Sequence, residues 1–258
     1  MRITVFTSNQ PRHLSLLREL AEVSDQVFAI QEVNTLFPGI IEDFFSRSQT
    51  MESYFSNVRK AESKVFGAAE FLPSNVRQLA IKMGDLNRLE RENLAPALDA
   101  DLFVVFGSSF IKGWLIDFLV SKKAINIHMG VSPFYRGSSC NFWAMYDGNP
   151  SLVGSTIHRL SRGLDSGDIL FHCLPLPQEG DSPFDFTMRA VTAAHKGLRS
   201  RVERGDLLSM PTHVQDRSKE IRYSVNSDFS DRVAADFLSR EWKADWYETS
   251  QAELIEPF

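Results

Sequence analysis

The feature that most constrains the fold is an apolar run, Leu102–Phe106, which stands between Asp101 and Gly107. A continuous apolar run bounded by an acidic residue and a glycine is typical of a strand buried on both faces of a parallel sheet. The chain after it predicts a loop, a helix that ends near residue 120 and a second strand from residue 124. This order predicts adjacent parallel strands in a doubly wound sheet, with two consecutive loops at the same edge.

The start of the chain gives the same alternation. A strand over residues 2–7, a helix over 14–20 and a strand over 26–30 predict a β-α-β unit. We therefore expect an α/β fold with a Rossmann-like, doubly wound and mostly parallel sheet, together with a small C-terminal appendage.

Residues 41–98 are rich in charge and predict helices. Pro73 and Pro96 should separate these helices, because proline removes a backbone hydrogen bond and clashes with the preceding turn. A later hairpin is predicted around residue 165.

The main domain is expected to end near Gly205, after a helix over residues 183–202. We assign residues 1–205 to this domain and residues 206–258 to the appendage. The appendage has few aliphatic residues and is too small to fold alone, so it should pack back on the core or form a surface for a partner. Its aromatic residues include Trp242, Trp246 and Tyr247.

The overall charge weighs against a nucleic-acid partner. The net charge is −5 and the pI is near 5.7, whereas polyanion binding needs basic patches. Cys140 and Cys173 lack metal-ligand spacing, so we expect neither a metal site nor a disulfide framework. The apolar runs are too short to cross a bilayer, and a strand rather than a signal peptide follows Met1. We expect a cytoplasmic protein with no membrane partner.

Two polar residues mark the strand that begins near residue 124. Asn126 and His128 are two positions apart, so their side chains point to the same face of the sheet, at the end where α/β folds place their chemistry. Asp165 stands in a later turn, Gly163–Asp168, after a strand-like segment. An amide, an imidazole and a carboxylate together predict a site for acyl transfer to an amine.

Each of these residues has a possible role in that chemistry. Asn126 can donate to the oxyanion, and one such donor contributes roughly 3–4 kcal/mol of transition-state stabilisation. His128 suits a general base or a second oxyanion contact, and Asp165 can orient it or receive the proton through water. A structural reading stays open, because a histidine on a strand is more often structural and an Asp between glycines commonly forms a turn.

The loop between the first strand and helix is polar. Residues 8–13 surround the predicted start of a helix, which favours an anion such as a phosphate. An ordinary helix cap with solvated side chains explains the same residues equally well.

The ordered motifs resemble the formyltransferase family that uses 10-formyltetrahydrofolate. They are Asn126-Ile-His128, Ser132–Gly137, Gly154–His158 and Gly163–Ile169, and the resemblance covers about residues 1–200. It implies that residues 1–205 form the catalytic domain, with Asn126, His128 and Asp165 carrying catalysis. It also implies a pterin site formed by Phe106, Gly107, Ser109, Phe110, Ile111, Gly163, Leu164 and Asp165.

Within that family the sequence departs from the methionyl-tRNA enzymes. Met129-Gly130 and Cys140 differ from their usual residues, and the tail is too short and acidic for their C-terminal barrel. The run Met129–Trp143 is similar to the nucleotide-sugar N-formyltransferases, such as the GDP-perosamine type. This resemblance implies a nucleotide-sugar acceptor, a role in lipopolysaccharide O-antigen synthesis and a homodimer.

The acceptor is expected on the side of the polar N-terminal loop and the Tyr135-Arg136 loop. Arg136 has the best physical reason, because a guanidinium can bind phosphate oxygens in bidentate fashion, although it could instead brace its own loop. Trp143 fits a core position better. The residues assigned to the acceptor are Ser8, Asn9, Gln10, Arg12, His13, Tyr135, Arg136 and Asn141.

Several alternatives stay open at this point. The enzyme could formylate glycinamide ribonucleotide or methionyl-tRNA, or hydrolyse the formyl-folate. The chain could also be a nucleotide-binding module without catalysis, or an assembly protein whose aromatic tail is its functional part.

Overall fold

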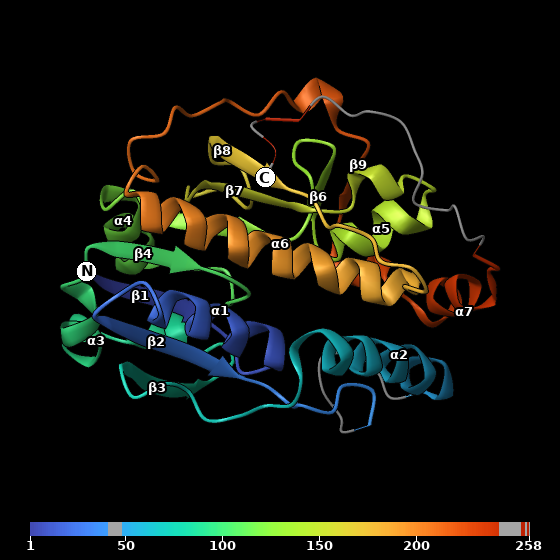
Figure 1. Ribbon diagram of the computed structural model, residues 1–258, viewed down its shortest axis with the longest axis horizontal. Coiled ribbons are helices and arrows are strands. Elements are labelled where there is room, and N and C mark those ends of the chain that lie inside the picture. Colours follow the sequence, from blue (N-terminus) through green and yellow to red (C-terminus); the bar gives the residue numbers. More distant parts are fainter. Residues whose placement is uncertain (41–47, 243–253, 256, 258) are drawn as a thin grey trace.

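The computed structural model describes residues 1–40, 48–242, 254, 255 and 257 of the 258-residue chain. Within these residues a seven-stranded sheet has the order β3-β2-β1-β4-β5-β7-β8 and carries helices on both faces (Figure 1). The five strands from β3 to β5 run parallel, whereas β7 is antiparallel to both β5 and β8. The expected mostly parallel α/β sheet is therefore confirmed.

The alternation of side chains along the central strands builds the two layers. In β1 (Arg2–Thr7), Ile3 and Val5 face α1 (Pro11–Ala21) and α6 (Pro183–Arg204), whereas Phe6 faces α3 and α4. In β4 (Leu102–Val105), Val104 packs on the side of the sheet that α1 and α6 cover, and Phe103 packs on the opposite side. Because these strands are buried on both faces, they read as continuous apolar runs in the sequence.

The order of the other elements follows from this core. They are β2 (Gln26–Val33), α2 (Gln49–Phe66), β3 (Val76–Lys82), α3 (Arg91–Leu98), α4 (Gly113–Ser121), β5 (Ile125–His128), β6 (Tyr135–Gly137), α5 (Cys140–Tyr146), β7 (Ser155–Arg159), β8 (Ile169–Cys173), β9 (Arg222–Ser224) and α7 (Asp231–Ser239), with short 3₁₀ turns between some of them.

The prediction of helices throughout residues 41–98 is wrong in one part. Strand β3 forms the edge of the sheet beside β2, and its side chains are mostly exposed. An edge strand keeps polar residues at its solvated positions, which hides the apolar pattern by which a buried strand is recognised. Pro73 separates α2 from β3, whereas Pro96 lies inside the short helix α3 and does not break it. Residues 41–47 lie outside the described residues.

The described part of the appendage is in contact with the main domain. Strand β9 pairs with β6 in a small second sheet, and α7 packs on α2. In Figure 1 the orange segment before β9 arches past β8, the edge strand of the sheet, and the backbones of His213 and Ile169 exchange two 2.8 Å hydrogen bonds there. The division of the chain at residue 205 stays a prediction. Trp246 and Tyr247 lie outside the described residues.

Among the residues that the structure describes, no helix is both long and apolar enough to cross a membrane.

Candidate active site

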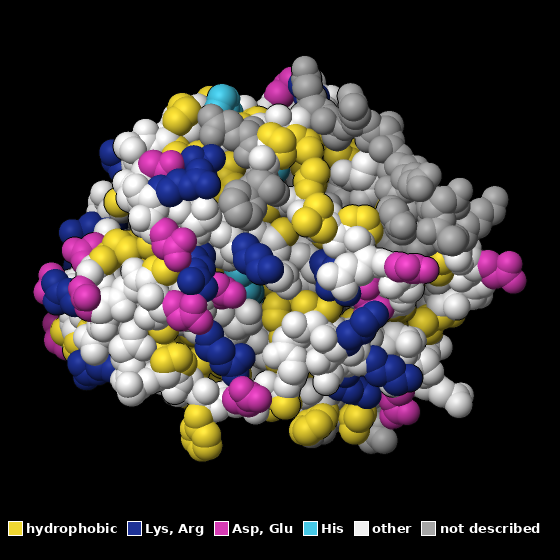
Figure 2. All heavy atoms as spheres, in the orientation of Figure 1, with side chains coloured by type: hydrophobic (Ala, Val, Ile, Leu, Met, Phe, Trp, Pro, Cys, Tyr) yellow, Lys and Arg dark blue, Asp and Glu magenta, His cyan; other side chains and the backbone are white. Residues whose placement is uncertain are grey.

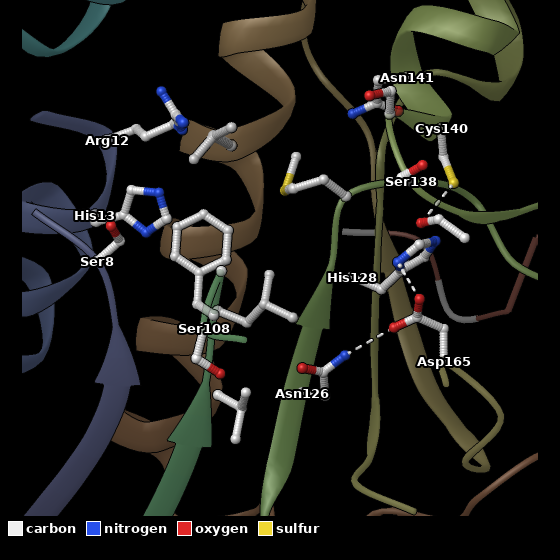
Figure 3. A pocket seen from close by; sticks show the side chains of 18 of the residues that line it. Ser8, Arg12, His13, Ser108, Asn126, His128, Ser138, Cys140, Asn141 and Asp165 are labelled. Atoms are coloured by element: carbon white, nitrogen blue, oxygen red, sulfur yellow. Dashed lines mark hydrogen bonds and ion pairs between the residues drawn. The ribbon is translucent and has the colours of Figure 1, made fainter. Parts of the chain in front are cut away.

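A cavity of about 660 Å³ opens at the C-terminal ends of β1, β4 and β5 (Figure 3). Its walls come from the start of α1, the loop after β4, strand β5, the loop after β7 and the N-terminal part of α5. Helices α2 and α6, the ends of β2 and β3 and Phe229 of the appendage supply further parts of the wall. Loops from parallel strands meet at this edge, which is where doubly wound folds bind ligands.

Asn126, His128 and Asp165 meet at this cavity, and we call them the polar cluster. Asn126 and His128 lie on β5, whereas Asp165 lies on the turn between β7 and β8 (Figure 3). The Asn126 amide donates to Asp165 Oδ1 at 3.2 Å, and His128 Nδ1 lies 3.3 Å from Asp165 Oδ2. Three residues predicted from the sequence for catalysis are thus brought into contact.

The polar cluster carries a buried ion pair. Burial is the largest influence on His128 and would by itself lower its pKa, but the charge and hydrogen bond of Asp165, together with the Cys140 thiol, outweigh it and hold that pKa well above the usual value of 6.5. Burial likewise disfavours the Asp165 carboxylate, yet His128 and His158 hold the pKa of Asp165 well below its usual range. At neutral pH the imidazole is therefore a cation and the carboxylate an anion.

His158 is a fourth member of this arrangement that the sequence prediction left out. It stands on β7 directly opposite Asn126 in the antiparallel ladder. Its Nδ1 donates to the Arg159 carbonyl at 2.8 Å, so Nε2 accepts from the Asn126 amide at 2.9 Å. Both N–H groups of Asn126 are thus held. The sequence shows His158 only as a histidine on another expected strand. Its contact with Asn126 can be recognised only when the register between β5 and β7 is known.

The residues predicted for the pterin site line one part of the cavity. The loop after β4 lies on one side, and the Gly163–Asp165 turn lies on the other. Phe110 and Leu164 are the most exposed apolar side chains there, at 45% and 44%. The lining members of the predicted set are Phe106, Gly107, Ser109, Phe110, Ile111, Gly163, Leu164 and Asp165.

A buried carboxylate at the end of β2 holds the loop after β4. Glu32 is fully buried and accepts from the backbone N–H of Ser109 at 2.6 Å and from its hydroxyl at 2.8 Å. It also accepts from the Gly84 N–H at 2.8 Å. The sequence prediction missed Glu32, because nothing in its own strand marks it as a partner of a loop 77 residues away.

The polar N-terminal loop contributes Ser8, Gln10, Arg12 and His13 to the cavity wall. The start of α1 already faces an anion of this chain, since Glu62 accepts from the Arg12 N–H at 3.1 Å and from its guanidinium at 2.8 Å. The anion site predicted at this helix start is therefore occupied by a carboxylate from α2.

His13 and Asn9 have internal partners. Burial holds the pKa of His13 well below 6.5, so at neutral pH this ring adds no positive charge; it contacts the Thr7 hydroxyl and stacks near Phe106. Asn9 is absent from the cavity lining, and its side chain exchanges two hydrogen bonds with the backbone of Asn34.

Tyr135 and Arg136, which were expected in a loop, lie on the short strand β6 and are absent from the main cavity lining. Tyr135 is fully buried, and its carbonyl oxygen is 3.3 Å from His128 Nε2. Arg136 pairs with Glu220 at 2.9 Å and donates to the Leu164 carbonyl at 3.2 Å, beside a second hollow of about 450 Å³. Asn141 does line the main cavity, and Trp143 is buried in the core, as expected for it.

An aromatic wall faces the polar cluster from α2, α5 and α6 and from the appendage, and sequence reasoning missed it. These residues are far apart in the chain, so no local pattern joins them. Tyr54 contacts four other rings with centroids 4.9–5.9 Å apart. The lining members are Tyr54, Phe55, Phe142, Phe184 and Phe229.

No group of three or more His, Cys, Asp or Glu side chains that could hold a metal ion occurs in the described part of the chain. Both cysteines are free and buried, and the Cys140 thiol lies beside the polar cluster.

The chain belongs to the formyl transferase family. Residues 47–202, more than half of the 258-residue sequence, match the family described as Formyl transferase. The resemblance drawn from the motifs is therefore confirmed.

The similar proteins are enzymes with different acceptors. Methionyl-tRNA formyltransferase of Acidobacterium capsulatum is 36% identical over 83 residues, which are 32% of this chain and 25% of that protein. GDP-perosamine N-formyltransferase of Brucella melitensis is 26% identical over 125 residues, 43% of this chain and 48% of that protein. The chain thus spans half or less of the length of these curated relatives.

Solved structures share the fold at low sequence identity. The N-formyltransferase of Helicobacter canadensis, in complex with folinic acid and dTDP-3-aminofucose, aligns with a TM-score of 0.53 at 15% identity. The alignment covers 88% of this chain and 72% of that one.

Proposed function

We propose that this chain transfers a formyl group from 10-formyltetrahydrofolate to the amino group of a nucleotide-linked amino deoxysugar. The observation that carries the proposal is the contact of Asn126, His128 and Asp165 at a cavity of a formyl transferase fold. The Brucella relative supports an acceptor of the GDP-perosamine kind, and the ligands of the Helicobacter structure support both substrate classes.

The residues around one part of the cavity fit a flat, polar-edged heterocycle. Val105, Ile111, Ile116 and Leu160 supply apolar walls, and the backbones of two loops border them. Apolar walls with a few polar groups are typical of cofactor sites. When bound there, 10-formyltetrahydrofolate supplies the formyl group. We assign it to the loop after β4 and to the Gly163–Asp165 turn.

His128 is assigned to the developing oxyanion rather than to the general base. Acyl transfer to an amine places negative charge on the carbonyl oxygen, and a protonated imidazole can donate to it. A base, in contrast, must be neutral before it accepts a proton, and Asp165 keeps His128 charged. The Nε2–H group makes a long contact of 3.3 Å to the Tyr135 carbonyl, and the Cys140 thiol is a second, weak partner of this imidazole, so a ligand oxygen can replace them.

Asn126 is the second donor in this proposal. Its amide gives one N–H to His158 at 2.9 Å and the other to Asp165 at 3.2 Å, and the longer bond is the one to be exchanged for substrate. Asp165 orients His128 and relays the proton of the amine to water. Its low pKa makes it a poor final acceptor, which favours a relay.

The aromatic wall and the N-terminal loop are assigned to the acceptor. Aromatic side chains supply large apolar contact areas against a ring. Arg12 is the one arginine or lysine among the described residues that line the cavity, and Glu62 already offsets its charge. We therefore expect sugar contacts from Ser8, Gln10 and Asn141, with the diphosphate reaching beyond the cavity.

The charge distribution supports a small acceptor over a tRNA. On the face shown in Figure 2, basic and acidic side chains are interspersed over α1 and α6. Arg199, for example, pairs with Glu19, Glu22 and Glu203. Binding of a polyanion instead needs unpaired basic charge. The cytoplasmic location, the homodimer and the role in O-antigen synthesis stay predictions.

The test is to incubate the protein with 10-formyltetrahydrofolate and GDP-, dTDP- and UDP-linked amino sugars, following release of tetrahydrofolate and formylated product. Glycinamide ribonucleotide and methionyl-tRNA complete the panel. We expect release that depends on one of the amino sugars and is lost in His128→Gln. Release without any amine would instead identify a hydrolase. Formylation of glycinamide ribonucleotide or tRNA alone would contradict the acceptor class, and no release with any acceptor would contradict the activity.

A further inference from the structure

The turn that carries Asp165 is held in an unfavourable backbone conformation. Asp165 has φ +44°, in the left-handed region, which residues with a side chain adopt uncommonly and which persists where the surroundings impose it. Inside the turn, the Ser161 hydroxyl contacts the Ser166 hydroxyl at 2.9 Å and donates to the Gly163 carbonyl at 3.1 Å. These bonds lie on the N-terminal side of the turn, and the carbonyl groups around Asp165 need partners from elsewhere.

The partners come from the appendage. Gln215 Nε2 donates to the Asp165 carbonyl at 2.9 Å and to the Gly167 carbonyl at 2.8 Å. One side-chain amide thus donates to two backbone carbonyl groups of the turn, those of Asp165 and Gly167. Two residues earlier, His213 and Ile169 are joined by a pair of backbone hydrogen bonds, which fixes where the Gln215 backbone lies.

A second connection reaches the same turn from the same segment. Glu220 pairs with Arg136, whose guanidinium donates to the Leu164 carbonyl at 3.2 Å. Arg136 is therefore a brace between the appendage and the turn. The carbonyl groups of Leu164, Asp165 and Gly167 all find their partners through residues 215–220 or through Arg136.

We propose that Gln215 is a positioning residue, which holds the backbone of the Asp165 turn so that the carboxylate faces His128 and Asn126. Its effect on turnover rests on the proposed function, whereas its effect on the polar cluster does not. The proposal gives the appendage a role in the site, although no appendage residue belongs to the polar cluster itself.

The geometry makes the polar cluster sensitive to this support. The contacts of Asp165 with His128 and Asn126 are 3.3 and 3.2 Å, at the long end for hydrogen bonds, so a small shift of the turn breaks both. The titratable groups that bear on His128 are Asp165 and Cys140, and His158 faces the same carboxylate. A displaced Asp165 leaves His128 in a buried position without its main negative partner.

The test compares Gln215→Met with the wild-type protein. Methionine keeps the length of the side chain and removes both hydrogen bonds. The pKa of His128 is followed by NMR of its imidazole, assigned by its loss in His128→Gln. We expect that pKa to fall, and kcat to fall about tenfold with a smaller change in KM, because a misplaced catalytic group affects chemistry more than binding.

Ser218→Ala is the matched control. It removes a hydroxyl of the same segment that donates to Asp216 and does not contact the turn, so both readouts should stay at wild-type values. Gln215→Leu is a second variant, which removes the donor without adding a charge. It should lower the His128 pKa and kcat by about as much.

A folded Gln215→Met or Gln215→Leu protein in which His128 titrates as in the wild type would overturn the proposal. The NMR titration needs no substrate, so it separates the two ideas. A lowered His128 pKa in a protein that formylates no amine would support the positioning role and contradict the proposed function.

Discussion

Replacing Asp165 with Asn tests whether the charge of this carboxylate sets the state of His128. The substitution keeps the size of the side chain but removes the negative charge, and one of the two oxygens that lie 3.2 and 3.3 Å from Asn126 and His128 becomes an amide N–H donor. Burial then dominates, because it is the largest influence on His128 and disfavours the cation. The His128 pKa, held well above 6.5 in the wild type, should fall below that value.

The sign of the effect on activity follows from the oxyanion role. Wild-type kcat should stay high while His128 is protonated and fall as the pH rises through its raised pKa. In Asp165→Asn this fall moves to a lower pH, so at neutral pH one charged oxyanion donor is lost. Loss of one such donor costs about 10²–10³ in kcat, or roughly 3–4 kcal/mol.

The assay is kcat against pH with saturating 10-formyltetrahydrofolate and amine, together with an NMR titration of His128. A variant whose alkaline limb and His128 titration stay where they are in the wild type would refute the reasoning. If the titration moves but kcat at neutral pH does not, the ion pair is real and the oxyanion role of His128 is wrong.

Three further predictions rest on other parts of the site. Gly107→Ala should destabilise the protein by about 2–4 kcal/mol in urea unfolding, because the position has φ +69° and a Cβ would lie 2.3 Å from the buried His13 ring. Gly148→Ala is the control: its φ is +78° but its Cβ would meet open space, so it should show only the cost of the backbone conformation. Glu32→Gln should raise KM for 10-formyltetrahydrofolate about tenfold with little change in kcat, because an amide cannot accept all three hydrogen bonds that hold Ser109 and Gly84. Glu179→Gln, at an exposed position, is the control, and an unchanged KM in Glu32→Gln would contradict the prediction. Burial lowers the pKa of His195 to about 3 and of His172 to about 4, so the unfolded chain binds more protons than the folded one below pH 6.5. The free energy of unfolding should therefore decrease between pH 6.5 and pH 4, and His195→Phe should make this decrease smaller.

Much of the sheet could be predicted because its central strands are written as continuous apolar runs. Leu102–Phe106 is such a run, and its burial on both faces is the reason. Strand β3 could not be recognised in the same way, since its mostly exposed side chains follow no buried period. The expectation that Pro96 would separate two helices was wrong because tertiary contacts decide there. Leu94 and Ala97 of α3 are buried, and their packing outweighs the one backbone hydrogen bond that Pro96 removes.

The polar cluster could be predicted in part for a geometric reason. Asn126 and His128 share a strand, so their common face follows from the period of two. The partner roles of His158, Glu32 and Gln215 depend on strand register and on loops that meet across the sheet, which no local pattern contains. The assignment of Arg136 and His13 to the substrate stays a prediction, and both have internal partners that the sequence cannot reveal.

The placement of these supports has a consequence for how the site can change. The acid, amide and imidazole of the polar cluster lie on β5 and on one turn, while the groups that hold them come from β7 and the appendage; Glu32 on β2 likewise holds the loop after β4. A change in the appendage can therefore alter the charge of His128 without touching the cluster. The supporting contacts are hydrogen bonds to backbone carbonyl or N–H groups, which constrain position and leave the identity of the loop side chains free. Residues such as Phe110 and Leu164 can vary with the ligand, whereas Glu32 and Gln215 cannot vary without moving the loops that carry them.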